Sequence, residues 1–231
     1  METKQALEAW QTILGTATTE PLPTVTNSLW HVSAEDNREY VLKQLPEYPP
    51  GAGPIDEFRV VSFLQSRGIP VAPPIITDDG HIFTERNDRR YALLPKLPND
   101  HGNHDLGPQA ATTAYNIGEA IGRIDKALAE CPWPVRSFED DPAKDLPESM
   151  DKLPKEVTKI VASLTDRLTE AVADLPRQRA VGDCNEGNVL VYGTEVSGFI
   201  DLDHLPISPR VRDLAYYLVS RLRFPTRQAT V

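Results

Sequence analysis

The feature of this sequence that most constrains its fold is a change of hydrophobic pattern near Pro98. Before it, short apolar stretches are separated by clusters of turn-forming residues, which is typical of strands, and one segment over 54–68 has helical spacing. After it, apolar residues recur at steps of four and three over long stretches, which predicts helices. We therefore expect an α+β protein in which a β-rich first part and a mainly helical second part border a cleft.

The predicted elements follow from these patterns. In the first part, the expected strands cover 27–33, 39–45, 75–83 and 90–94, and the expected helix covers 54–68. In the second part, the expected helices cover 110–128, 157–172 and 213–223, and the expected short strands cover 189–192 and 196–200. The stretch 131–154 between the first two of these helices contains five prolines and an acidic run, so it is predicted to be an irregular loop.

Length, charge and cysteine content narrow the class of function. The 231 residues suffice for one domain of two lobes. The net charge of −10 argues against binding to nucleic acid or to anionic membranes and suits a cationic partner. No apolar run approaches the ~20 residues of a membrane helix, no signal-peptide pattern opens the chain, and Cys131 and Cys184 have neither a disulfide nor a metal-ligand spacing. These features predict a cytoplasmic protein, and none of them specifies an oligomeric state.

The stretch from Val181 to Asp203 contains the residue types that phosphoryl transfer requires. Asp183 and Asn188 stand five positions apart between apolar segments, and Asp201 closes the next predicted hairpin. A carboxylate can orient an attacking hydroxyl group and accept its proton, while an amide carbonyl and a second carboxylate are the hard oxygen ligands that Mg²⁺ prefers. Taken alone, the Asp-x-x-x-x-Asn spacing also fits a simple hairpin loop, because Asp, Asn and Gly are common turn residues. The apolar strand on each side favours the catalytic interpretation.

This segment resembles the catalytic core of the aminoglycoside phosphotransferase and choline kinase-like family, a group of phosphotransferases distantly related to protein kinases. The family's His-Gly-Asp triplet, Asn and Ile-Asp-Phe-like stretch correspond to Val181–Asp183, Asn188 and the residues around Asp201. Its later Pro-x-x-x-Asp-Leu-Ala corresponds to Pro209–Ala215. The similarity spans roughly residues 25–220 and is specific around these motifs. It implies a two-lobed protein-kinase-like fold and ATP-dependent phosphorylation of a small molecule's hydroxyl group.

The resemblance implies roles for residues of the second lobe, which is expected to cover 99–231. By this resemblance, Asp183 is expected to be the catalytic base, and Asn188 and Asp201 are expected to bind Mg²⁺. Asp203 is expected to be a more distant acidic group of the same metal site. Asp213 is expected to bond the backbone of the catalytic loop, although an Asp at that place would cap a helix in any fold.

The first lobe, expected to cover 1–98 with the hinge at its end, is implied to bind ATP. The implied contacts are Asn27 and Ser28 in the phosphate-covering loop, Lys43 on a strand, Glu57 on the helix, and Lys96 and Leu97 in the hinge. On the residues alone, Lys43 could be a solvent-facing strand end and Glu57 an exposed acid of a first helical turn. The order Lys, Glu, hinge, Asp, Asn, Asp is that of the kinases, which favours the functional interpretation.

The sequence departs from the family's pattern at three places. Val181 stands where the family has the His that braces the metal-binding loop, and the segment 26–28 contains no glycine. The C-terminus is short for the family, since only 214–231 follow Asp213, where relatives add helices that line the acceptor pocket. Any acceptor pocket is therefore expected to be shallow, to depend on the acidic run 139–141, and to suit a cationic hydroxyl compound.

The expected acceptors are an aminoglycoside-like compound, an amino alcohol, homoserine or a sugar derivative. The alternative to a working kinase is a catalytically impaired, kinase-like nucleotide-binding or regulatory protein, which Val181 and the short C-terminus favour. His101, His104 and Asp105 could form a metal site, but a polar connector with turn residues is the favoured interpretation. Cys184 lies beside the expected catalytic Asp but has no nearby His base, and we interpret it as a packing residue without a catalytic role.

Overall fold

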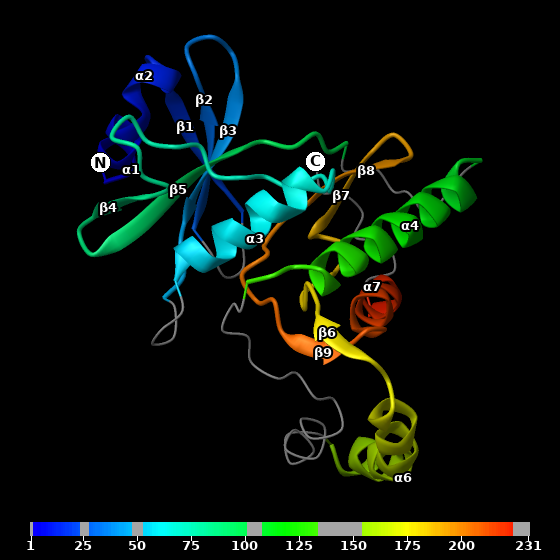
Figure 1. Ribbon diagram of the computed structural model, residues 1–231. Coiled ribbons are helices and arrows are strands. Elements are labelled where there is room, and N and C mark those ends of the chain that lie inside the picture. Colours follow the sequence, from blue (N-terminus) through cyan, green and yellow to red (C-terminus); the bar gives the residue numbers. More distant parts are fainter. Residues whose placement is uncertain (1, 24–27, 48–52, 101–107, 134–153, 224–231) are drawn as a thin grey trace. The chain divides into compact units, whose positions relative to one another are not determined.

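The computed structural model describes residues 2–23, 28–47, 53–100, 108–133 and 154–223 of the chain (Figure 1). The chain divides into two compact units. The first comprises Met1–Gly102 and Leu190–Ile200, and the second comprises Asn103–Val189 and Asp201–Val231. The first unit is built on an antiparallel sheet and the second is mainly helical, so the predicted α+β class is confirmed.

The first unit contains a five-stranded sheet with the order β1-β2-β3-β5-β4, in which all neighbouring strands are antiparallel. Its strands are β1 (Thr18–Leu22), β2 (Leu29–Ser33), β3 (Glu39–Gln44), β4 (Thr84–Arg86) and β5 (Arg89–Pro95). Three of the four predicted strands are therefore confirmed. The strand predicted over 75–83 is wrong, because Ile75 makes a single isolated bridge to Leu93 and the chain then turns, with the Gly80 N–H donating to the Thr77 carbonyl oxygen.

A helical segment that the sequence analysis did not predict precedes this sheet. It consists of α1 (Glu2–Leu7), the 3-10 turn η1 (Glu8–Trp10) and α2 (Gln11–Leu14). The core of the first unit joins this segment to the strands, and its largest members are Leu7, Trp10, Leu14, Val32, Tyr40, Leu42, Tyr91 and Leu93. The indole Nε1 of Trp10 also donates a hydrogen bond of 2.7 Å to the carbonyl oxygen of Ile75. One face of the sheet is thereby covered by the N-terminal helices.

The helix predicted over 54–68 is α3 (Pro54–Ser66). Pro54 is its first residue, and Gly68 follows its end with a φ of 71°, a left-handed conformation that glycine adopts readily. Its buried residues include Glu57. On β3, Leu42 belongs to the core formed with the N-terminal helices, so Lys43, the next residue, points to the opposite face of the sheet.

The hairpin of β7 (Val189–Tyr192) and β8 (Glu195–Phe199) was predicted nearly to the residue. Its place in the first unit was not, since the division expected at residue 98 assigned it to the second part. The Phe199 N–H donates to the carbonyl oxygen of Pro70 at 2.9 Å, and Phe199 makes a parallel bridge with Val71. The chain thus leaves the second unit after Val189 and re-enters it at Asp201.

The second unit contains the three predicted helices, as α4 (Ala110–Ala129), α6 (Lys155–Ala173) and α7 (Arg212–Arg223). It also contains a two-stranded antiparallel sheet of β6 (Arg177–Arg179) and β9 (Ile207–Pro209), which was not predicted because three residues are too few to show a period. Within the described ranges, no helix is long and apolar enough to cross a membrane.

The apolar faces of the three helices differ in burial. On α4 the predicted seam is buried, including Ile117, Ile121, Ile124 and Leu128. On α6 and α7, several apolar side chains are exposed, namely Val157, Ile160, Leu164, Leu214 and Leu218. The spacing of apolar residues therefore located all three helices, but it identified a buried face only for α4.

Candidate active site

The loop 181–188 holds the predicted catalytic carboxylate in a defined orientation. The side-chain amide Nδ2 of Asn188 donates to Oδ2 of Asp183 at 3.0 Å and to its backbone oxygen at 2.9 Å. Nδ2 of Asn185 donates to the other carboxylate oxygen, Oδ1, at 2.9 Å. Both carboxylate oxygens therefore accept a side-chain hydrogen bond, and the structure brings together Asp183 and Asn188 as the sequence predicted.

Asn185 and Gly182 give this loop its shape. Oδ1 of Asn185 accepts hydrogen bonds from the backbone N–H groups of Gly187 at 2.8 Å and Asn188 at 3.2 Å, which closes a turn on the side chain. Gly182 has a φ of 86°, and a Cβ atom there would lie 2.6 Å from Cδ of Pro206, so the position requires glycine. Sequence reasoning did not single out Asn185, although an Asp-x-Asn pattern in a loop of turn formers is a usable signal.

Asp213 in the first turn of α7 anchors the backbone of the same loop. Its Oδ2 accepts the N–H of Val181 at 2.6 Å, and its Oδ1 accepts the N–H of Gly182 at 2.9 Å. The residue is fully buried, where hydrogen bonds between a carboxylate and N–H groups are strong. The predicted bond between Asp213 and the catalytic loop is confirmed.

Val181 and Cys184 are the buried side chains of this loop. Val181 lacks a polar group with which to brace the loop, but its backbone N–H is one of the two that Asp213 holds. Burial is the main reason why the pKa of the Cys184 thiol lies well above its ordinary value, and the negative charge of Asp213 raises this pKa further. A thiol with such a pKa is not a nucleophile at neutral pH, which agrees with the interpretation of Cys184 as a packing residue without a catalytic role.

Asn188 and Asp201 supply the oxygen donors of the proposed metal site. The Nδ2 atom of Asn188 is directed at Asp183, which leaves its carbonyl oxygen as the atom for a metal. Asp201 lies two residues after the end of β8 and has a left-handed φ of 58°, and both side chains are partly exposed. An amide oxygen and a carboxylate in one unit are donors that fit Mg²⁺ together with nucleotide phosphates.

The structure supports the other proposed metal ligands less well. Oδ1 of Asp203 lies 3.8 Å from Nε2 of His204, and the Asp203 side chain is 13% exposed. Across the described ranges, no group of three or more His, Cys, Asp and Glu side chains could hold a metal ion. His101, His104 and Asp105 lie outside the described residues, as does the acidic run 139–141.

Lys43 and Glu57 are both buried in the first unit, with exposed fractions of 6% and 7%. Lys43 lies in the middle of the sheet, opposite Leu29 on β2 and Ala92 on β5. The alternatives of a solvent-facing Lys43 and an exposed Glu57 are therefore wrong. Because ionised side chains are rarely buried unless they are partnered, this burial supports the interpretation of the two as a functional pair.

The two predicted hinge residues differ in their surroundings. The Lys96 N–H donates to the carbonyl oxygen of Glu39 at 3.2 Å, and its Nζ donates to Oε2 of Glu39 at 3.0 Å. Leu97 lies against β8, where a Cβ atom on Gly198 would clash with its side chain. Since Glu39 engages both the amide and the ammonium of Lys96, Leu97 is the better candidate for a nucleotide contact.

Two hydrogen bonds join the hairpin β7–β8 to the segment that follows the predicted hinge. Oγ of Ser197 donates to the carbonyl oxygen of Pro98, and the Gly193 N–H donates to Oδ2 of Asp100 at 2.7 Å. No sequence motif indicated these contacts. Of the predicted phosphate-loop residues, Ser28 is exposed immediately before β2, and Asn27 lies outside the described residues.

A protein-family model described as the phosphotransferase enzyme family matches residues 18–230, which is most of the chain. Among curated proteins, none matches it. Similar solved structures include the amicoumacin kinase hAmiN in complex with AMP-PNP, Ca²⁺ and Ami, which is 17% identical with a TM-score of 0.72. That match covers 96% of this chain and 69% of the other.

Two further solved structures are similar over nearly the whole chain. A microcompartment-associated aminopropanol kinase is 14% identical with a TM-score of 0.71, and the match covers 94% of this chain and 73% of the other. A spectinomycin phosphotransferase in complex with ADP and spectinomycin is 16% identical with a TM-score of 0.61, and the match covers 92% of this chain and 71% of the other. At these identities the likeness establishes the fold, and the expected protein-kinase-like fold is confirmed.

Proposed function

The chain belongs to the phosphotransferase enzyme family and is a small-molecule kinase by class, and from this premise we propose that it transfers the γ-phosphoryl group of ATP to a hydroxyl group of a small molecule. The observation that carries the proposal is the loop in which Asn185 and Asn188 orient Asp183 while Asp213 holds the backbone. A carboxylate oriented by fixed neighbours is what general-base catalysis needs.

In the proposed reaction, Asp183 orients the acceptor hydroxyl group and accepts its proton as the hydroxyl oxygen attacks the γ-phosphorus. Each carboxylate oxygen has two lone pairs, so the bonds from Asn185 and Asn188 leave capacity for the incoming hydroxyl. The same Asn188 serves two purposes, since its amide nitrogen holds the base and its carbonyl oxygen would bind Mg²⁺ together with Asp201. The bound ion would supply positive charge to the phosphate oxygens.

The proposed nucleotide contacts come from the first unit. Lys43 would bind the α- and β-phosphates, and Glu57 would hold the Lys43 ammonium in place. Leu97 would contact the adenine from the segment after β5. The burial of Lys43 and Glu57 supports this assignment, because a buried charged pair serves as a rigid phosphate contact rather than as a mobile surface charge.

The proposed acceptor is a hydroxyl compound that also carries a positive charge, such as an amino alcohol or an aminoglycoside-like compound. The net charge of −10 favours a cationic substrate by long-range attraction. Among the similar structures, one is named for aminopropanol, one for amicoumacin and one for spectinomycin. Homoserine and sugar derivatives remain among the proposed acceptors, and they allow a comparison with compounds that carry more positive charge.

The experiment that tests the function is a measurement of ADP release with ATP and Mg²⁺ across a panel of small hydroxyl compounds. At least one member should raise ADP release above that without acceptor, and mass spectrometry should find the acceptor heavier by one phosphoryl group. Asp183→Asn is the matched control, because it keeps the shape of the side chain and one of its two acceptor oxygens but removes the base. Phosphorylation that survives in Asp183→Asn would contradict the mechanism, and ATP binding without any acceptor-dependent turnover would favour the regulatory alternative.

A further inference from the structure

Helix α4 buries an aspartate within its apolar face. Asp125 follows Ile117 and Ile121 at the helical step of four, and it is 8% exposed between the buried Ile124 and Leu128. A carboxyl group in such a place is costly unless it is neutral, paired or hydrogen-bonded. The proposed phosphotransfer steps do not use it.

The partner of Asp125 is the carboxyl group that anchors the catalytic loop. Asp213 on α7, the helix that packs against α4, is the strongest charge acting on Asp125, and the buried Oδ1 of Asp125 has no hydrogen-bond partner within the described residues. Two carboxylates have no hydrogen to share, so a hydrogen bond between them requires a proton on one. Both oxygens of Asp213 already accept N–H groups, from Val181 and Gly182, so the proton belongs to Asp125.

We propose that Asp125 is a neutral carboxylic acid that donates a hydrogen bond to Asp213 and thereby positions the catalytic loop. It is a positioning residue, because its effect passes through Asp213 to the backbone of Val181 and Gly182 and then to Asp183. If Asp125 were ionised, a second negative charge would lie beside the buried Asp213, and their repulsion would loosen the loop. The consequence for turnover rests on the proposed phosphotransferase function, whereas the protonation itself does not.

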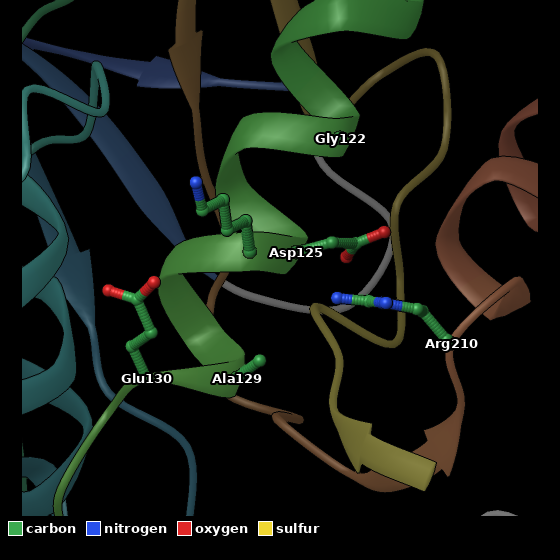
Figure 2. Close-up of a pocket in the computed structure, with 6 residues that line it drawn as sticks. Gly122, Asp125, Ala129, Glu130 and Arg210 are labelled. Atoms are coloured by element: carbon green, nitrogen blue, oxygen red, sulfur yellow. The ribbon is translucent and has the colours of Figure 1, made fainter. Parts of the chain in front are cut away.

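The charges around the pair favour this protonation. Burial, and then the charge of Asp213 and the hydrogen bond to it, raise the pKa of Asp125 to about 8, while Arg210 acts in the opposite direction. Figure 2 shows the Arg210 guanidinium group directed towards the Asp125 carboxyl group at a cavity of about 510 Å³. Arg210 is exposed, so water and salt screen its charge, whereas Asp213 is fully buried. Other titratable groups around the pair are Lys126 and Glu130 at the cavity, the buried thiol of Cys184, Arg212 on α7 and the buried Arg179 on β6, a strand that also contacts α4.

Infrared spectroscopy tests the protonation without nucleotide or acceptor. At about pH 6, the wild-type protein should show the C=O stretching band of a buried carboxylic acid, and Asp125→Asn should lack that band. Glu119→Gln, which removes an exposed acid from the same helix, should keep it. The band should disappear as the pH rises through about 8, and in Arg210→Gln it should disappear at a higher pH. The proposal would be overturned if the wild-type spectrum lacked this band, or if the band were still present in Asp125→Asn.

Hydrogen exchange tests the positioning. The backbone N–H groups of Val181 and Gly182 should be protected in the wild type and in Asp125→Asn, whose amide can still donate to Asp213. In Asp125→Ala these two amides should exchange about tenfold faster, because Asp213 loses a hydrogen-bond donor. Above about pH 8 the wild type should lose protection relative to Asp125→Asn at the same pH. Equal protection in the Asn and Ala variants at every pH would exclude a positioning role.

The kinetic test separates this role from general stability. Once an acceptor is known, the kcat of the wild type should fall above about pH 8, while Asp125→Asn should not show that fall and the KM for ATP should stay unchanged in both. The same fall in both proteins would overturn the kinetic role of Asp125. If no compound is phosphorylated at all, the proposed function fails, and the infrared and exchange results still decide the state of Asp125.

Discussion

The buried acids of the two compact units have different charged neighbours. In the first unit the buried Glu57 accompanies a buried cation, Lys43, whereas in the second unit the strongest charge acting on the buried Asp125 is another buried acid, Asp213, although Arg179 is buried there too. Opposite charges can both stay ionised because each compensates the other, whereas two buried acids in contact cannot. Under the proposed function, the first unit would hold a fixed charge for binding phosphate, and the second unit would depend on a proton to hold the loop that carries the proposed base.

The largest expected effect separates chemistry in the second unit from binding in the first. Asp183→Asn should lower kcat by ~10²–10⁴ and leave the Kd for ATP nearly unchanged, because the amide cannot accept the hydroxyl proton. Lys43→Ala should instead weaken ATP binding. Steady-state kinetics and calorimetry measure the two quantities. Full turnover in Asp183→Asn would show that another group acts as the base.

The next effect concerns the buried charges of the first unit. If Lys43 and Glu57 are a pair, Glu57→Gln should lower the free energy of unfolding by roughly 3–5 kcal/mol, because removing one partner of a buried ion pair leaves the other charge uncompensated. Lys43→Met in the Glu57→Gln background should recover part of the loss. Denaturant unfolding of the wild type, the two single variants and the double variant completes a double-mutant cycle, which measures the coupling between the two residues. Additive effects of the two changes would mean that the residues are not a pair.

A somewhat smaller effect is expected for the anchor of the catalytic loop. Asp213→Ala should lower the free energy of unfolding by about 3 kcal/mol, because it leaves the buried N–H groups of Val181 and Gly182 without an acceptor. Asp213→Asn keeps one acceptor oxygen and should lose less. The comparison requires unfolding curves of both variants in urea. Equal stability of Asp213→Ala and the wild type would contradict the anchoring role.

The last comparison concerns the dependence of stability on pH, which should arise from the second unit. The pKa of Asp125 in the folded protein is about 8, well above the ordinary value of 3.8, so the folded state keeps a proton that the unfolded state releases. By linkage, the contribution of Asp125 to stability is fully present below about pH 4 and is lost as the pH rises to about 8. The Tm of the wild type should therefore fall relative to that of Asp125→Asn across this window.

A matched control accompanies this pH series. Glu119→Gln alters an exposed acid of the same helix and should follow the wild type. Parallel Tm curves for the wild type and Asp125→Asn would show that Asp125 holds no extra proton in the folded protein.

Strong local patterns predicted much of the fold. The steps of four and three found α4, and Pro54 with Gly68 bounded α3. The N-terminal helices were overlooked, although Ala6, Leu7, Trp10 and Leu14 have helical spacing and are all buried. Strands such as β6 and β9 are too short to show a period, so only the tertiary structure identifies them.

In the candidate site as well, some residues could be predicted from the sequence and others could not. The motif residues Asp183, Asn188 and Asp213 could be predicted because loop chemistry requires those residue types, and the structure joins Asp183 to Asn188 directly. Asp125 could not be assigned a role, because an acid in a helical seam becomes informative only when its neighbour across the helix contact is known. Contacts between distant segments, such as Ser197 with Pro98, leave no local pattern at all.

The measurement that tests the central claim most directly is calorimetry of ATP binding with and without Mg²⁺. If Asn188 and Asp201 hold the metal that joins the nucleotide to the catalytic loop, Mg²⁺ should tighten ATP binding to the wild type, and Asp201→Ala should abolish that gain while still binding ATP alone. An equal dependence on Mg²⁺ in the wild type and Asp201→Ala would contradict the metal site, and an absence of ATP binding to the wild type would contradict the proposed function as a whole.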